Sequence, residues 1–166
     1  MNKIQSFLIV SCIACIAFAS CTKTGKEKES VTAVTSKSKI YMDISHGQKF
    51  WNDPANMDGM ETNQIERVKY MTAELLKNTS AVDAELLYLK EKITAEQLAD
   101  CDLLFIHIPS LPYSKAEVKA ITQYLDNGGS LFLVMDTDYW STLQQTNVND
   151  LISPYDIRFG SPSPDT

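Results

Sequence analysis

The sequence predicts an α/β domain, a doubly wound and mostly parallel sheet of about five strands flanked by helices. Two observations carry this prediction. Strand-like and helix-like patterns alternate along residues 39–166, an order that places helices on both faces of a parallel sheet. The segments LLFIHI (103–108) and LFLVM (131–135) are apolar without alternation, as expected of strands that are covered on both faces.

Each helix and strand is predicted by its own local pattern. In the first long helix, Ile65, Val68, Met71 and Leu75 recur every three or four residues, and Asp58 is the expected cap. Capping-box patterns open helices at residues 94–97 and 114–117, and Asn-Gly-Gly ends the second of these. The expected strands are 40–44, 84–89, 103–108, 131–135 and 157–159, and the expected helices are 61–77, 94–100, 114–126 and 147–152.

The N-terminal segment 1–20 has a positive start at Lys3, an uncharged apolar run and two small residues before Cys21. This pattern is typical of a secretory signal, and its end resembles the lipobox of bacterial lipoproteins. The resemblance implies cleavage before Cys21, acylation of Cys21 with palmitate-type chains, and a lipid anchor in the bacterial cell envelope, facing the periplasm or the cell surface. The alternative is an ordinary signal peptide followed by a coincidental cysteine. Residues 21–38 are polar and are expected to form a flexible tether before the domain at 39–166.

Composition excludes several classes of function. The formal net charge is -6, so the sequence lacks the basic footprint of a nucleic-acid-binding protein. Cys12 and Cys15 would leave with the signal segment and Cys21 would be acylated, so Cys101 would have no partner for a disulfide. No spacing of histidine, cysteine or acidic residues forms a known metal motif, and no cofactor is predicted.

Three stretches resemble a known family: YMDISHGQ (41–48), SKAEVKAITQYLDNGGSLFLVMD (114–136) and NDLISPYDIRFG (149–160). They are similar to class I glutamine-amidotransferase-like domains of flavodoxin-like fold. Their non-catalytic relatives occur in bacterial envelope proteins, in the gliding and ABC-transport associated group, and in the N-terminal domain of an intraflagellar transport protein. The resemblance implies a non-catalytic domain. Such domains usually continue past the fifth strand, so we expect either a fragment or a minimal copy.

The sequence lacks the nucleophile that an amidotransferase needs. No Gly-x-Cys-x-Gly or Gly-x-Ser-x-Gly elbow is present. Cys101 precedes the strand at 103–108, whereas sites in open α/β sheets lie beyond the carboxyl ends of the strands. We therefore predict no catalytic residues.

Polar residues follow three of the predicted strands, and in a parallel sheet they would share one edge. The candidate ligand-binding residues there are Asp43, Ser45, His46, Gly47, Gln48, His107, Asp136 and Asp138. The long loop at 46–59 adds aromatic residues, and Trp51 and Trp140 are candidates for stacking on a ligand. The alternative is that these polar groups satisfy one another locally and that the aromatic rings cover the edge of the sheet.

The predicted function is that of a membrane-tethered, non-catalytic binding domain of the bacterial envelope. Its expected partners are the membrane, through the lipid anchor, and an envelope protein, a polar small molecule or a glycan. One alternative is a hydrolase, perhaps acting on carbohydrate, that uses Asp43, His46 and His107. Another is a truncated piece of a larger envelope protein.

Overall fold

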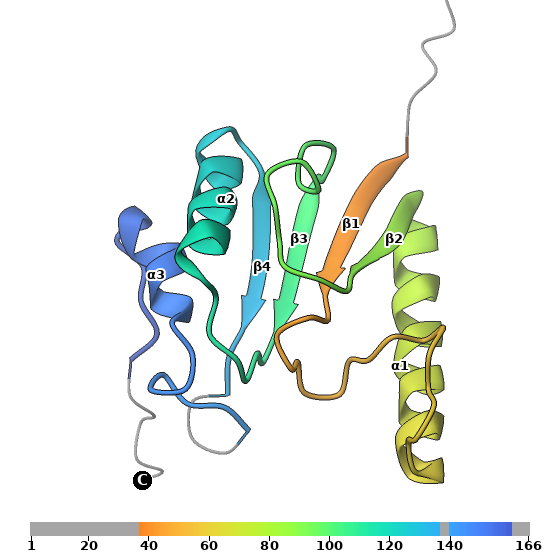
Figure 1. Ribbon diagram of the computed structural model, residues 1–166. Coiled ribbons are helices and arrows are strands. Elements are labelled where there is room, and N and C mark those ends of the chain that lie inside the picture. The colour runs from red at the N-terminus through yellow and green to blue at the C-terminus, as the bar shows by residue number, and fades with distance from the viewer. Residues whose placement is uncertain (1–36, 137–139, 161–166) are drawn as a thin grey trace, which may run out of the picture. The chain divides into compact units, whose positions relative to one another are not determined.

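The computed structural model describes residues 37–136 and 140–160, and these form an α/β unit around one parallel sheet (Figure 1). Every strand pairing in the sheet is parallel, and the strand order is β2-β1-β3-β4. The strands are β1 (Ser38–Asp43), β2 (Ala84–Leu89), β3 (Leu103–His107) and β4 (Ser130–Val134). The helices are α1 (Thr62–Ala81), α2 (Lys115–Asp126), α3 (Val148–Ile152) and the short 3-10 helix η1 (Ser153–Tyr155).

The predicted α/β class and parallel sheet are confirmed, but the described residues contain four strands where about five were predicted. The segment 157–159 does not form a strand. The Asn149 side chain donates to the Phe159 carbonyl (3.1 Å) and accepts from the Phe159 amide (2.9 Å). A side chain therefore occupies the backbone groups that a fifth strand would have used for pairing.

The helix starts follow the capping chemistry of the sequence with one correction. Ser114 and Glu117 form the predicted capping box of α2. At α1 the cap is Glu61, which forms its box with Gln64, and the predicted cap Asp58 plays no such part. Residues 94–100 form turns instead of the predicted helix, although Thr94 and Gln97 exchange the side-chain hydrogen bonds of a capping box.

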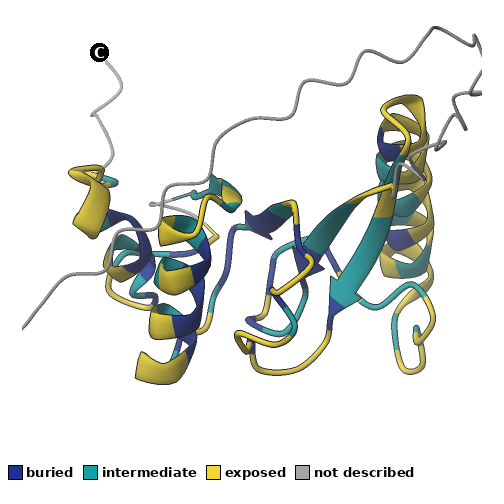
Figure 2. Ribbon diagram, turned by 90° about the horizontal axis from the view of Figure 1, so that it is seen from above, coloured by how far each residue is buried: buried dark blue, intermediate teal, exposed yellow. Residues whose placement is uncertain are grey.

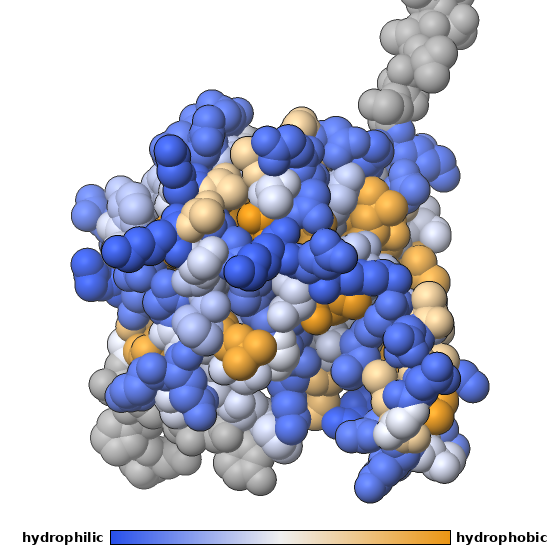
Figure 3. Space-filling model, in the orientation of Figure 1, coloured by the Kyte–Doolittle hydropathy of each residue, from blue (hydrophilic) through white to orange (hydrophobic). Residues whose placement is uncertain are grey.

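Helices cover the two faces of the sheet at opposite ends, as Figure 2 shows. Leu104, Ile106, Ile121 and Leu151 are fully buried in the core cluster that α2 and α3 close. Met42, Trp51 and Phe105 form the second cluster, on the face that α1 covers near β1 and β2. The face seen in Figure 1 is mostly hydrophilic, with apolar residues in small separate patches (Figure 3).

Because all four strands run in parallel, their carboxyl ends lie along one edge, the lower edge in Figure 1. The loops that follow β1, β3 and β4 meet along this edge, where the sequence places its candidate site residues. Among residues 37–136 and 140–160, no helix is long and apolar enough to cross a bilayer.

Candidate functional site

The end of β1 carries a buried carboxylate with a complete set of hydrogen bonds. Asp43 is 0% exposed. Its Oδ1 accepts from the amide (2.9 Å) and hydroxyl (2.8 Å) of Ser45. Its Oδ2 accepts from His46 Nδ1 (2.9 Å) and from the Tyr113 hydroxyl (2.8 Å). Asp43, Ser45 and His46 were predicted to lie at this edge, and the structure brings them together.

The other side of His46 faces a second carboxylate, which sequence reasoning assigned only to helix capping. His46 Nε2 lies 3.2 Å from Glu117 Oε1. Glu117 is buried, accepts from the Ile93 amide (3.0 Å) through Oε1 and accepts from the Ser114 amide (2.9 Å) through Oε2. One residue of α2 thus joins the helix cap, the segment after β2 and the loop after β1.

Tyr113 completes this buried cluster of Asp43, His46, Tyr113 and Glu117, which we call the clamp. Its ring stacks on the His46 imidazole, with centroids 3.9 Å apart and planes 25° apart. Burial and the charge of Asp43 hold the pKa of Tyr113 well above its usual value, so its hydroxyl stays a donor.

Hydrogen bonds hold the pKa values of both clamp carboxylates below their usual range. Burial alone would raise the pKa of Asp43, but the hydrogen bonds from His46, Ser45 and Tyr113 and the charge of His46 outweigh it, and the pKa is lowered. Burial would likewise raise the pKa of Glu117. The hydrogen bonds from Ser114 and Ile93 outweigh this effect, so the pKa of Glu117 is also lowered. Each ring nitrogen of His46 faces one of the two carboxylates, so the imidazole ring lies between Asp43 and Glu117.

The clamp does not have the geometry of a catalytic triad. In a triad the acid and the nucleophile contact opposite nitrogens of the histidine ring. Here the Ser45 hydroxyl (3.0 Å) and Asp43 (2.9 Å) both contact Nδ1, and Glu117 is at Nε2. His46 therefore has no nitrogen with which to take a proton from the Ser45 hydroxyl.

The clamp also fixes the loop after β3. The His46 carbonyl accepts from the amides of Ser110 (2.9 Å) and Leu111 (3.1 Å). Gln48 accepts from the His46 amide through Oε1 (3.0 Å), and the Gly47 carbonyl accepts from the Ser110 hydroxyl (2.8 Å). Gly47 and Gln48, both predicted as site residues, thus act in the turn that joins two loops.

The remaining candidate residues lie away from the clamp. His107 is half-buried beside Phe105 and Trp51 on the α1 face, with ring centroids 6.0 and 6.1 Å away, and burial lowers its pKa. Asp136 is half-buried just beyond β4, and Asp138 lies outside the described residues. No three His, Cys, Asp or Glu side chains in the described part of the chain are placed to hold a metal ion.

The two candidate stacking residues have different surroundings. Trp51 is 7% exposed and packs against Phe105, so its ring belongs to the core. Trp140 is 38% exposed and packs edge-on against Phe50, with ring centroids 5.4 Å apart.

The sequence itself identifies the family. The sequence model of the family described as IFT52 GIFT domain matches residues 62–163, which is more than half of the chain. The chain belongs to the IFT52 GIFT domain family. No curated protein shows significant sequence similarity to it.

Solved structures similar to this GIFT-family chain are larger than it is. The structure titled "mmIFT52 N-terminal domain" has 21% sequence identity and a TM-score of 0.47, over 70% of this chain and 44% of that one. A β-galactosidase from Bifidobacterium adolescentis has 13% identity and a TM-score of 0.38, over 76% of this chain and 56% of that one. The chain therefore spans less than two thirds of either protein.

The family corrects the identity predicted from the sequence. The domain is of the IFT52 GIFT type, and the prediction of a bacterial lipoprotein with a glutamine-amidotransferase-like domain is wrong. The predicted envelope-binding function, the lipid-anchor, envelope-protein and glycan partners and the envelope localisation are wrong with it, and the family does not support the hydrolase alternative. A signal-like start is a short pattern of low specificity, whereas the match spans most of the folded sequence. Cys21 and the rest of residues 1–36 lie outside the described residues.

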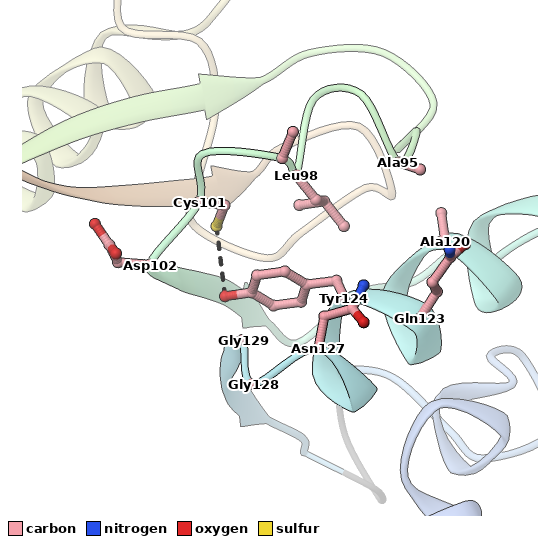
Figure 4. A pocket seen from close by; sticks show the side chains of 11 residues that line it. Ala95, Leu98, Cys101, Asp102, Ala120, Gln123, Tyr124, Asn127, Gly128 and Gly129 are labelled. Carbon is pink, nitrogen blue, oxygen red and sulfur yellow. Dashed lines mark hydrogen bonds between the residues drawn. The ribbon is translucent and has the colours of Figure 1, made fainter. Parts of the chain in front are cut away.

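Cys101, the cysteine among the described residues, lies just before β3, and Figure 4 shows its side chain pointing toward Tyr124. It lines a hollow of about 380 Å³ and donates from Sγ to the Tyr124 hydroxyl (3.6 Å). Burial raises the pKa of the thiol, which keeps it protonated. Since the thiolate is the reactive form, the raised pKa disfavours reaction of this cysteine.

Replacing Gly47 by alanine is expected to destabilise the fold more than replacing Gly59 by alanine. Both glycines have positive φ (63° and 76°), so both substitutions strain the backbone. A Cβ at Gly47 would overlap the Ser110 hydroxyl, whereas a Cβ at Gly59 meets no atom within 4 Å. The overlap should add about 1–3 kcal/mol to the loss in free energy of unfolding, measured by urea denaturation. Equal losses in the two variants would contradict the close approach of the two loops.

The clamp carboxylates should make stability fall at low pH. Their pKa values are lower in the folded than in the unfolded chain, so their contribution is complete above their unfolded pKa values of about 4 and is lost as pH falls through the folded ones. The unfolded pKa values set the range of interest at about pH 5 to pH 3. Over this range we expect the free energy of unfolding to fall less steeply in Glu117→Gln than in the wild type. Urea titrations across this range measure both slopes, and identical slopes would show that Glu117 is not held ionised.

Proposed function

We propose that the chain is a non-enzymatic protein-binding domain that takes part in an intraflagellar transport assembly. Membership of the IFT52 GIFT domain family supports the transport role. The clamp supports a role without chemistry, because its polar groups are engaged with one another and do not have the geometry of a catalytic triad.

The observation that carries the proposal is the exposed side chain of Phe132 on the apolar strand β4. Its sequence, SLFLV, has no charged residue, yet it is the last strand of the described sheet. Phe132 at its centre is 53% exposed and packs on Phe105, with ring centroids 5.0 Å apart. Edge strands usually carry charges that prevent pairing with other chains, and exposed apolar surface commonly marks a protein-binding site. We place the binding surface on β4 around Phe132, with another protein of the assembly as its partner.

The proposal is tested by isolating the tagged full chain from cells of its source organism and identifying the co-purifying proteins by mass spectrometry. We expect enrichment of other intraflagellar transport proteins over a control with the tag alone. A preparation that contains no protein enriched over this control would contradict the proposed function.

A further inference from the structure

A small hollow lies between the loop after β1 and the first turns of α1. Its volume is about 160 Å³, and its lining residues are Gln48, Lys49, Phe50, Asn52, Gln64, Arg67 and Val68. Sites for whole small molecules usually measure about 300–1,000 Å³. The hollow is therefore of a size to receive the head group of one side chain.

Two of the residues that line this hollow, Lys49 and Arg67, have cationic groups that lie near aromatic rings. The Lys49 ammonium lies 3.9 Å from the centroid of the Trp140 ring, and the Arg67 guanidinium lies 5.1 Å from that of Phe50. An aromatic face attracts a cation without neutralising its charge. Within the part of the chain that the structure describes, no carboxylate lies within 4.0 Å of either cation. On a protein of net charge -6, this is a local site of positive charge.

The backbone of the loop after β1 is strained at Phe50, whose ring lies near the cations. Phe50 has a φ of 72°, a conformation that is uncommon for any residue other than glycine and that often marks functional sites. Its ring lies 5.8 Å from the Lys49 ammonium and 5.1 Å from the Arg67 guanidinium, so the unusual backbone brings one aromatic ring near both cations. Gln48 is 5% exposed, and its Nε2 makes no hydrogen bond of ordinary geometry among the described residues.

We propose that this hollow binds the carboxylate of an aspartate or glutamate side chain presented by a protein partner. The proposal rests on the proposed protein-binding function and adds a second, polar contact to the apolar one at Phe132. The planar fork of Arg67 matches a carboxylate with two parallel hydrogen bonds, and Lys49 adds a second positive charge. The size of the hollow favours one side chain over a complete metabolite.

The test uses the full chain and a minimal probe, Nα-acetyl-glutamate amide, with Nα-acetyl-glutamine amide as its neutral isostere. The side-chain resonance of Arg67 and the indole resonance of Trp140 are followed by NMR during titration. We expect saturable shifts with the glutamate probe and none with the glutamine probe. Equal shifts with both probes, or none with either, would overturn the proposal.

Variants identify the residues responsible. Arg67→Gln and Lys49→Gln should each weaken binding of the glutamate probe about tenfold, a factor that corresponds to about 1.4 kcal/mol. Lys69→Gln is a change of the same kind at an exposed position of α1, and should leave the affinity for the glutamate probe within about twofold of the wild-type value. Circular dichroism verifies that each variant is folded. Inorganic phosphate is the competing anion, and tighter binding of phosphate through the same two residues would overturn the assignment to a carboxylate.

The two proposals can fail separately. If Arg67→Gln and Lys49→Gln retain every protein partner that the wild type captures, the hollow is not part of the interface, although the protein-binding function stands. If the wild type captures no partner while the probe still binds, the carboxylate site exists but its assignment to a protein partner is overturned together with the proposed function.

Discussion

Replacing His46 by alanine is expected to lower the free energy of unfolding by about 3 kcal/mol or more, because two buried carboxylates each lose a polar partner. The substitution removes the ring that lies between Asp43 and Glu117, which are 0% and 3% exposed, and that stacks on Tyr113. The two buried carboxylates would then have no polar ring between them. Urea denaturation at pH 7 measures the effect.

A matched control and a compensating variant sharpen this prediction. Lys37→Ala breaks an ion pair whose side chains are 64% and 79% exposed, and should leave stability almost unchanged. Adding Asp43→Asn and Glu117→Gln to His46→Ala removes both uncompensated charges and should recover part of the loss. A loss in His46→Ala no larger than that in Lys37→Ala would show that the clamp does not hold these loops.

Replacing Leu104 by alanine is expected to cost about 2–5 kcal/mol, because the substitution leaves a cavity in a closely packed core. Leu104 lies in β3, is 0% exposed and belongs to the cluster closed by α2 and α3. Leu76→Ala on α1 removes the same atoms from a side chain that is 45% exposed, and should cost far less. Thermal unfolding of the two variants measures the difference. Similar melting temperatures would contradict the conclusion that β3 is covered on both faces of the sheet.

Local patterns predicted the elements of the fold well where several signals agreed. Strand β2 has the predicted bounds, and β1, β3 and β4 differ from theirs by one or two residues at their ends. The helix predicted at 94–100 was wrong because a capping box specifies only how a helix starts, and the segment has no long apolar face to continue it. The strand predicted at 157–159 was wrong because the sequence pattern cannot show that Asn149 binds the backbone there.

The sequence predicted only those features of the candidate site that follow from the direction of the strands. A parallel sheet places the residues that follow β1, β3 and β4 along one edge, so the grouping of Asp43, Ser45 and His46 could be anticipated. Glu117 was missed as a member because its capping role already explained it, and nothing local showed that its second oxygen reaches His46. His107 is the last residue of β3, and the alternation of side chains along the strand turns it toward the face that carries Phe105 and Trp51.

The central claim is that this chain acts by binding another protein through β4, and a matched pair of variants tests it most directly. Phe132→Ser and Leu111→Ser remove apolar side chains of nearly equal exposure, 53% and 52%, one on β4 and one on the loop after β3. Partner recovery from native cells, quantified by mass spectrometry for each folded variant, should fall about tenfold or more in Phe132→Ser, as for a residue at the centre of an interface. Recovery with Leu111→Ser should match the wild type. Equal recovery in all three proteins would contradict the claim.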